Sequence, residues 1–119
     1  MTWSDTSTRR TATTSSCTSL ARATDLTRPL QQFATDYCWG AIWTRPGLEL
    51  KTRSLLNIAM LTALGKSDEL RAHVRGALRN GATLDELREV LMQTAVYCGL
   101  PAALEAARLA QAAVEEYEK

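Results

Sequence analysis

The sequence contains a single histidine, His73, which is the first candidate for acid–base chemistry. It follows Leu70 by three positions and precedes Ala77 by four, so a helix would carry it on its apolar stripe. An imidazole there is either a core side chain whose nitrogens are satisfied by neighbours, or a general acid or base tuned by its pocket. Position alone leaves both interpretations open.

Two arginines, Arg45 and Arg53, flank a turn, and Arg53 begins a segment that becomes wholly apolar within two residues. A guanidinium in that setting is partly desolvated and suits bidentate capture of a carboxylate. The alternative is an internal salt bridge to Glu69, Asp36 or another acid. The pair is therefore a candidate anion-binding element or a structural one.

Three aromatic residues lie near helix ends. Trp39 and Trp43 are four positions apart and could wall a pocket, although this spacing also suits simple packing. Tyr97 precedes Gly99 and is either a hydroxyl donor or an amphipathic core residue whose hydroxyl reaches water.

Other residue classes exclude much of the common chemistry. One histidine and scattered carboxylates predict no metal site, and no glycine-rich loop follows a strand to seat a nucleotide cofactor. Cys17, Cys38 and Cys98 are odd in number and far apart, which describes neither a disulfide framework nor a redox pair. We therefore expect a reducing, cytoplasmic protein whose chemistry uses side chains alone, without a cofactor.

Charge and hydropathy exclude two partner classes. The formal net charge is +1 with acids and bases interspersed, so we expect no binding to nucleic acid. The most apolar stretch, residues 55–64, is interrupted by Asn57 and Thr62 and is too short to span a bilayer, so we expect no membrane partner.

These side chains must be positioned by helices, because no strand pattern is present. Residues 1–19 are rich in Ser and Thr and predict a disordered or atypical N-terminal tail, whereas residues 20–119 predict one helical domain. The fold class is therefore all-α, a compact bundle of about five helices behind the tail.

The expected helices are punctuated by proline, glycine and capping residues. They cover residues 27–42, 49–64, 67–80 and 83–98, and a fifth that starts at 101 and is Ala-rich through 113. The second is apolar nearly all round and is expected at the centre of the bundle. Ser67 is expected to cap the third, Thr83 and Glu86 to form a capping box on the fourth, and the acidic end of the fifth to fray.

Six short motifs together are hard to interpret as generic. They are WGAIWTRPGL (39–48), KTRSL (51–55), ALG (63–65), ELRAH (69–73), NGAT (80–83) and VYCGLPAA (96–103). They resemble the carboxymuconolactone decarboxylase family of the alkylhydroperoxidase-like superfamily, and the likeness covers about residues 20–114. The peroxidase branch carries a Cys-x-x-Cys before its histidine, and Lys66 and Glu69 stand at those positions here. Dithiol peroxide reduction is therefore excluded.

The resemblance implies an alkylhydroperoxidase-like fold in a homo-oligomer, a trimer or hexamer. It implies cofactor-independent decarboxylation of 4-carboxymuconolactone to 3-oxoadipate enol-lactone in protocatechuate catabolism. The conjugated lactone accepts the electron pair of the departing carboxylate, so no added electron sink is required. The family's usual ordered leader has no counterpart in residues 1–17, which are either a native tail or a misassigned start.

Under this resemblance the candidate residues take roles. Arg45 and Arg53 would hold the carboxylates that stay, and Trp39 and Trp43 would enclose the one that leaves. Tyr97 or His73 would stabilise charge on the lactone oxygen.

Proton return to carbon falls to His73 as the leading general acid, with Glu69 orienting it or competing as the proton carrier. Two alternatives remain open. One is a related lyase acting on another lactone or a β-keto acid, and the other is a non-catalytic helical oligomer that kept the fold.

Overall fold

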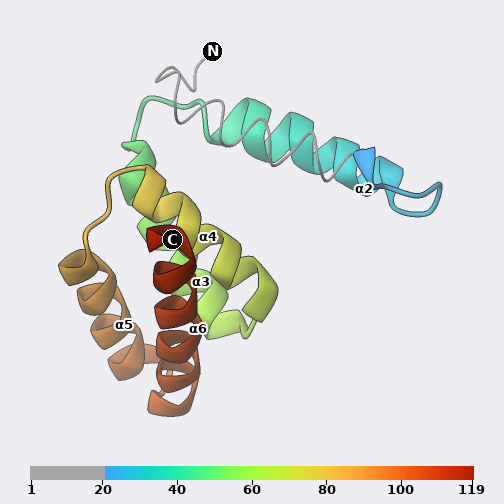
Figure 1. Cartoon of the computed structure of the whole chain (residues 1–119). Coiled ribbons are helices and arrows are strands. Elements are labelled where there is room, and N and C mark those ends of the chain that lie inside the picture. Colours follow the sequence, from blue (N-terminus) through green and yellow to red (C-terminus); the bar gives the residue numbers. More distant parts are fainter. Residues whose placement is uncertain (1–20) are drawn as a thin grey trace. The chain divides into compact units, whose positions relative to one another are not determined.

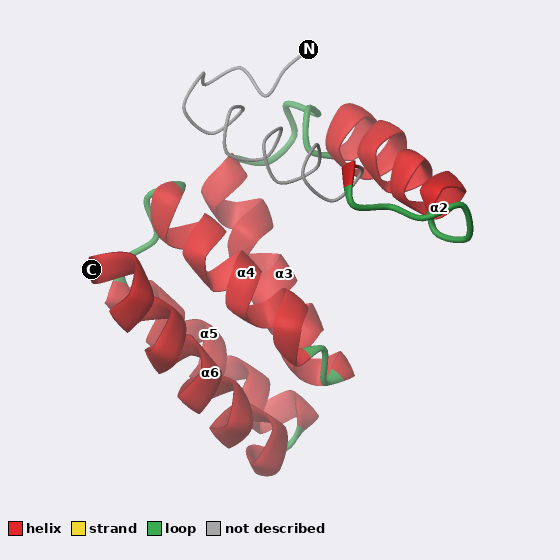
Figure 2. Cartoon of the chain, turned by 45° about the vertical axis from the view of Figure 1, so that its right-hand side comes forward, coloured by secondary structure: helices red, strands yellow, loops and turns green. Residues whose placement is uncertain are grey.

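The computed structural model describes residues 21–119, and the expected tail at 1–19, with Cys17, lies outside this range. The chain divides into two compact units, residues 1–50 and 51–119, which we describe separately. All secondary structure in residues 21–119 is helical, which confirms the all-α prediction for this part of the chain (Figures 1 and 2). In the same residues, no helix is long and apolar enough to cross a membrane.

The first unit contains one continuous helical rod with two kinds of winding. Helix α2 spans Arg28–Phe33, and the π-helix η1 follows it directly over Ala34–Ile42. The predicted helix at 27–42 is confirmed, but its second half has the wider turn, as the bond from the Trp43 N–H to the Cys38 carbonyl shows (3.0 Å). Such winding is rare and is frequent at functional sites.

Trp43 anchors a small apolar cluster at the end of this rod. Its side chain is 5% exposed, and Cys38, Trp39 and Leu50 pack against it. The two indole rings lie 5.1 Å apart between centroids and are tilted by 34°, a favourable aromatic geometry. The two indoles therefore pack against one another, and their role as a pocket wall stays a prediction.

The second unit consists of four helices. Their bounds are α3 Leu50–Leu64, whose first residue belongs to the first unit, α4 Ser67–Arg79, α5 Leu84–Cys98 and α6 Leu100–Glu118. Helix α6 packs against both α4 and α5, and its buried alanines Ala106, Ala110 and Ala113 permit close approach. The core adds larger side chains from the other helices, including Ile58, Leu70, Val74 and Leu87.

The expectation that the second helix lies at the centre is wrong. Helix α3 contributes Ile58 to the core, but Leu56, Met60 and Leu64 are 48%, 54% and 68% exposed. The Ala-rich α6 instead packs against two neighbours, because its small side chains let α4 and α5 come close to its axis. Apolar residues around a whole helix show that it is covered, but not that its own chain covers it.

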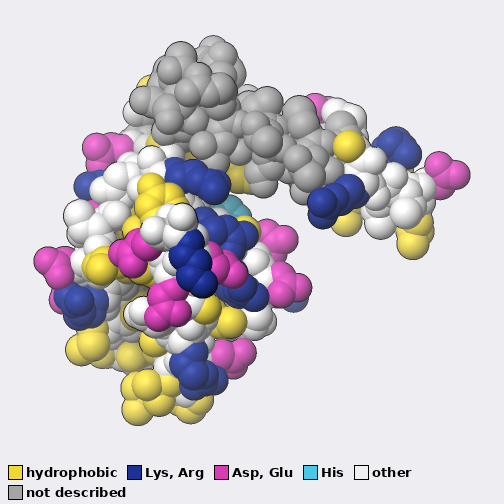
Figure 3. Space-filling model, in the orientation of Figure 1, with side chains coloured by type: hydrophobic (Ala, Val, Ile, Leu, Met, Phe, Trp, Pro, Cys, Tyr) yellow, Lys and Arg dark blue, Asp and Glu magenta, His cyan; other side chains and the backbone are white. Residues whose placement is uncertain are grey.

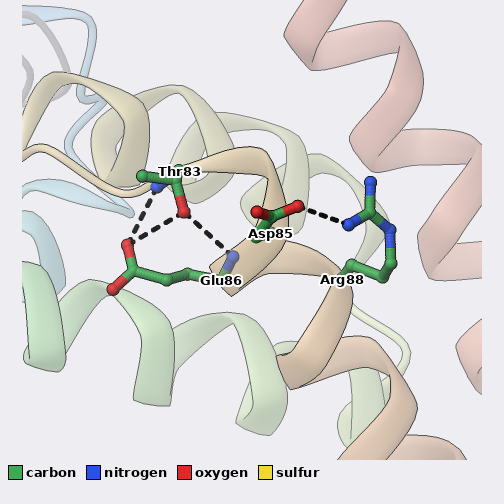
Figure 4. Close-up of polar contacts among 4 residues, drawn as sticks. All are labelled: Thr83, Asp85, Glu86 and Arg88. Atoms are coloured by element: carbon green, nitrogen blue, oxygen red, sulfur yellow. Dashed lines mark hydrogen bonds and ion pairs between the residues drawn. The ribbon is translucent and has the colours of Figure 1, made fainter.

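Helix ends follow the predicted punctuation closely. Gly65, Gly81 and Gly99 all have positive φ and follow the ends of α3, α4 and α5. The capping box is present: the Thr83 hydroxyl accepts from the Glu86 N–H at 3.1 Å, and the Thr83 N–H donates to the Glu86 carboxylate at 2.9 Å (Figure 4). Arg88 adds a bond to Asp85 in the same first turn.

Two predictions about helix ends are wrong. Ser67 is the first helical residue of α4 rather than its cap, and its hydroxyl donates to Glu105 of α6 at 3.4 Å. The acidic end of α6 stays helical to Glu118 because the Glu116 carboxylate binds Arg71 at 2.9 Å and Arg75 at 3.0 Å. These two cations offset the unfavourable interaction with the helix dipole.

The two cysteines of the described residues differ in exposure. Cys38 is half-buried in the first unit, whereas Cys98 is exposed at the C-terminus of α5, and both are free thiols.

Candidate active site

Helices α3 and α4 bring together three of the side chains that bear on acid–base chemistry. His73 lies on α4, and its Nδ1 is 3.5 Å from the amide nitrogen of Asn57 on α3. Its other nitrogen, Nε2, is 3.9 Å from a carboxylate oxygen of Glu69, one turn earlier on α4. The imidazole therefore has a polar group facing each nitrogen.

The ring is enclosed, while its acidic neighbour is open to water. The His73 side chain is 19% exposed and that of Glu69 is 69% exposed. Burial lowers the pKa of His73 below its ordinary value, and the Glu69 carboxylate opposes that shift without cancelling it. The neutral ring is therefore favoured at neutral pH, and the Glu69 carboxylate beside it is open to water.

A second polar contact fixes how α3 lies on α4. The Asn80 side-chain amide donates to the Ser54 hydroxyl at 2.8 Å, and Ser54 is 2% exposed. Residue 54 faces residue 80 and residue 57 faces residue 73, so the two helices run antiparallel. This register places the Asn57 amide against the His73 ring.

Arg53 lies on this face of α3, one turn before Asn57. Its side chain is half-buried, as expected for a guanidinium at the start of an apolar helix. Its role in holding a carboxylate stays a prediction. Lys51, two residues before it, pairs with Glu86 at 3.0 Å.

Three of the other predicted binding residues belong to the first unit. The rings of Trp39 and Trp43 pack there at a tilt, and Arg45 is exposed in the turn after η1. Tyr97 is 74% exposed on α5. The structure therefore brings His73 and Glu69 together, and the binding roles of these four residues stay predictions.

Asn57 is the polar partner that sequence reasoning missed. The sequence pattern marks Asn57 only as a polar interruption of the apolar stretch at residues 55–64. The available signal was the same interruption: an amide in an otherwise apolar helix needs a hydrogen-bond partner when it is buried. The identity of that partner depends on the α3–α4 register, which the sequence does not reveal.

Three hollows in the second unit are lined by residues other than His73. The largest apolar one is a groove of about 330 Å³ between α5 and α6, which includes Leu91, Met92 and Leu104. A smaller one of about 150 Å³ lies by the α3–α4 turn, and a charged one surrounds Arg71, Arg75 and Glu116. In residues 21–119, no cluster of His, Cys, Asp and Glu could hold a metal ion.

Comparison with known proteins gives a consistent assignment. The chain is 45% identical to the 4-carboxymuconolactone decarboxylase of Acinetobacter baylyi, over 78% of this chain and 69% of that protein. It is 42% identical to a nitrosuccinic acid decarboxylase of Metarhizium robertsii, over 82% and 68%. It is also 40% identical to an uncharacterised 15.0 kDa protein of Paracoccus denitrificans, over 68% and 62%.

The sequence profile of one family matches residues 28–112. This range includes His73, its two polar neighbours Asn57 and Glu69, and every predicted binding residue. The match extends from the first turn of α2 into α6. The chain therefore belongs to the carboxymuconolactone decarboxylase family.

Proposed function

We propose that this protein is a cofactor-independent carboxy-lyase that converts 4-carboxymuconolactone to 3-oxoadipate enol-lactone in the protocatechuate pathway. The observation that carries the proposal is the enclosed His73 beside the solvent-exposed Glu69, in a chain 45% identical to a decarboxylase of that substrate. The family match across residues 28–112 supports treating residues 20–119 as one functional domain.

The reaction has two steps that balance without an added redox partner. The C–C bond to the departing carboxylate breaks, CO₂ leaves, and its electron pair moves through the ring double bond to the lactone carbonyl oxygen. The resulting furanolate takes one proton on ring carbon and re-forms the carbonyl. The protein must therefore provide a donor to the growing oxyanion and one proton per turnover.

His73 and Glu69 fit these two requirements. The buried imidazole can donate a fixed hydrogen bond in a poorly solvated place, where such a bond is worth most. The exposed carboxyl group of Glu69 can recover a proton from water after each turnover. Tyr97 remains a second proposed donor to the lactone oxygen.

The remaining groups are proposed for binding. Arg45 and Arg53 would hold the acidic group that stays, by charge-assisted hydrogen bonds. The packed pair Trp39 and Trp43 would provide an apolar wall against which a departing carboxylate loses its hydration.

A related lyase is the second candidate function, and one relative favours it. Nitrosuccinic acid, named for the 42% identical protein, also carries two carboxyl groups and a group that can accept an electron pair on oxygen. The same donor and proton carrier would serve either acid, so the substrate is decided by the pocket. A non-catalytic oligomer that kept the fold is the remaining alternative.

An assay of the purified chain with 4-carboxymuconolactone and with nitrosuccinic acid separates these functions. We expect CO₂ release and enol-lactone from the first, with a smaller kcat/KM for the second. The reverse preference would establish the related lyase. A folded protein with no turnover of either acid would support the non-catalytic alternative and contradict the proposal.

We also propose that the chain is a cytoplasmic homo-oligomer, a trimer or hexamer. The two free thiols, one of them exposed, suit a reducing compartment. Exposed apolar side chains on α5 and α6 support self-association; they are Met92, Val96, Tyr97, Leu100 and Leu104. Figure 3 shows hydrophobic side chains gathered at the end of the second unit where α5 meets α6.

A further inference from the structure

We propose that Asn57 is a positioning residue of this site: its side-chain amide donates to Nδ1 of His73 and holds the neutral ring with its proton on Nε2. His73 then presents Nε2–H as a fixed hydrogen-bond donor. The two helices that carry these residues are antiparallel, and a second amide contact, from Asn80 to Ser54, sets their register.

The contacts on the two ring nitrogens select the same tautomer. An amide N–H can be accepted only by an imidazole nitrogen that carries no proton, and the Asn57 nitrogen lies 3.5 Å from Nδ1. On the opposite side, the Glu69 carboxylate lies 3.9 Å from Nε2 and favours a proton on that nitrogen. Each contact therefore favours Nε2–H and an unprotonated Nδ1.

The same arrangement disfavours the imidazolium. A proton added to Nδ1 would face the Asn57 N–H, so two donors would oppose one another. The amide that faces Nδ1 from α3 is uncharged, and Glu69 of α4, the helix that carries His73, places a carboxylate on the Nε2 side of the ring. Burial acts in the same direction by lowering the pKa of His73.

This tautomer gives His73 and Glu69 different roles in the reaction. The assignment of these roles rests on the proposed function. A neutral Nε2–H donates to the lactone oxygen as the electron pair arrives there, without giving its proton away. The proton that ends on ring carbon then comes from solvent by way of Glu69, which is a carboxylate beside the resting ring and carries a proton only during its transfer to carbon. Asn57 touches neither substrate nor reacting atoms and acts through the orientation and tautomer of His73.

Nitrogen NMR of the full chain tests the tautomer directly, because His73 is its only histidine. In the wild type above the pKa of His73, we expect Nε2 protonated and Nδ1 bare. Asn57→Leu, of similar size, should produce a mixture of tautomers. Asn57→Asp should bring a proton to Nδ1 and raise the pKa of His73 by about one unit, as expected for an adjacent carboxylate.

The matched control is Asn80→Asp, the same chemical change at the other α3–α4 amide contact. It faces Ser54 and should leave the His73 tautomer and its titration unchanged. A wild-type ring protonated on Nδ1, or a titration that Asn57→Asp does not move, would overturn the proposal. An equal effect of Asn80→Asp would overturn it too, because it would reveal a general disturbance of the helix pair.

Activity provides a second, separable readout. Asn57→Leu should lower kcat about tenfold or more, with a smaller change in KM, since the donor matters most in the transition state. If the wild type has the expected tautomer but turns over neither acid, the proposed function fails and the role of Asn57 in selecting the tautomer stands. If the wild type is active but protonated on Nδ1, the role of Asn57 fails alone.

Discussion

At the scale of single residues, the site depends on how one imidazole is surrounded. His73 is 19% exposed, and each of its nitrogens faces a polar group from a defined direction. Burial makes the neutral ring the stable form, so its chemistry begins from an uncharged donor and acceptor. Two predictions, one on catalysis and one on stability, follow from this environment.

Two substitutions of His73 should distinguish the effect of its hydrogen-bond donor from the effect of its side-chain volume. We expect His73→Ala to lower kcat about 10²–10³-fold, the loss typical of removing one donor to a developing oxyanion. His73→Gln keeps a side-chain N–H and should lose less. Steady-state kinetics on variants with unchanged circular dichroism measure both, and equal activity of wild type and His73→Ala would exclude His73 from the reaction.

The lowered pKa of His73 predicts a specific dependence of stability on pH. The unfolded chain binds a proton near the ordinary value of 6.5, whereas the folded chain binds it only at lower pH. Above pH 6.5 the ring of His73 is neutral in both the folded and the unfolded chain, so its contribution to stability is fully present there. That contribution is lost as the pH falls from 6.5 to the pKa of the folded chain.

Thermal unfolding between about pH 7 and 5 measures this effect, and His73→Gln should flatten the curve. Glu86, whose pKa is lowered from 4.5 by its bonds to Thr83 and Lys51, loses its contribution only at more acidic pH. A wild-type curve that matches His73→Gln throughout this window would contradict the prediction.

At the scale of helices, local signals predicted most of the boundaries and few of the contacts. The positive-φ glycines and the Thr83 capping box act within a few residues, so the sequence shows them. The α6 terminus depends on Arg71 and Arg75, which are more than forty positions away from Glu116. The Asn57–His73 contact likewise depends on a register between two helices that no local pattern encodes.

The capping box gives a test at this scale. Thr83→Ala removes the acceptor for the Glu86 N–H and should lower the free energy of unfolding by about 0.5–2 kcal/mol. Thr83→Ser keeps the hydroxyl and should lose much less. Urea denaturation of both variants measures the difference, and equal stability of the two would show that the hydroxyl contributes nothing.

At the scale of the whole molecule, the single chain leaves several large apolar side chains exposed to water. The sequence predicted a fully enclosed second helix, yet Met60 and Leu64 are more than half exposed, as are Met92 and Val96 on α5. A sequence pattern records that a side chain avoids water, whatever chain supplies the cover. The proposed oligomer would cover such exposed apolar residues on α5 and α6.

Charge placed in the α5–α6 groove should therefore separate the subunits without unfolding them. Met92 and Leu104 line that groove and are 61% and 53% exposed, so Met92→Glu or Leu104→Glu costs little in an isolated chain but buries a charge in the assembly. Light scattering after gel filtration should show the wild type as an oligomer and these variants as smaller species. Gln93→Glu adds the same charge at the exposed neighbour of Met92 and should leave the assembly intact. A monomeric wild type would refute the proposed oligomer.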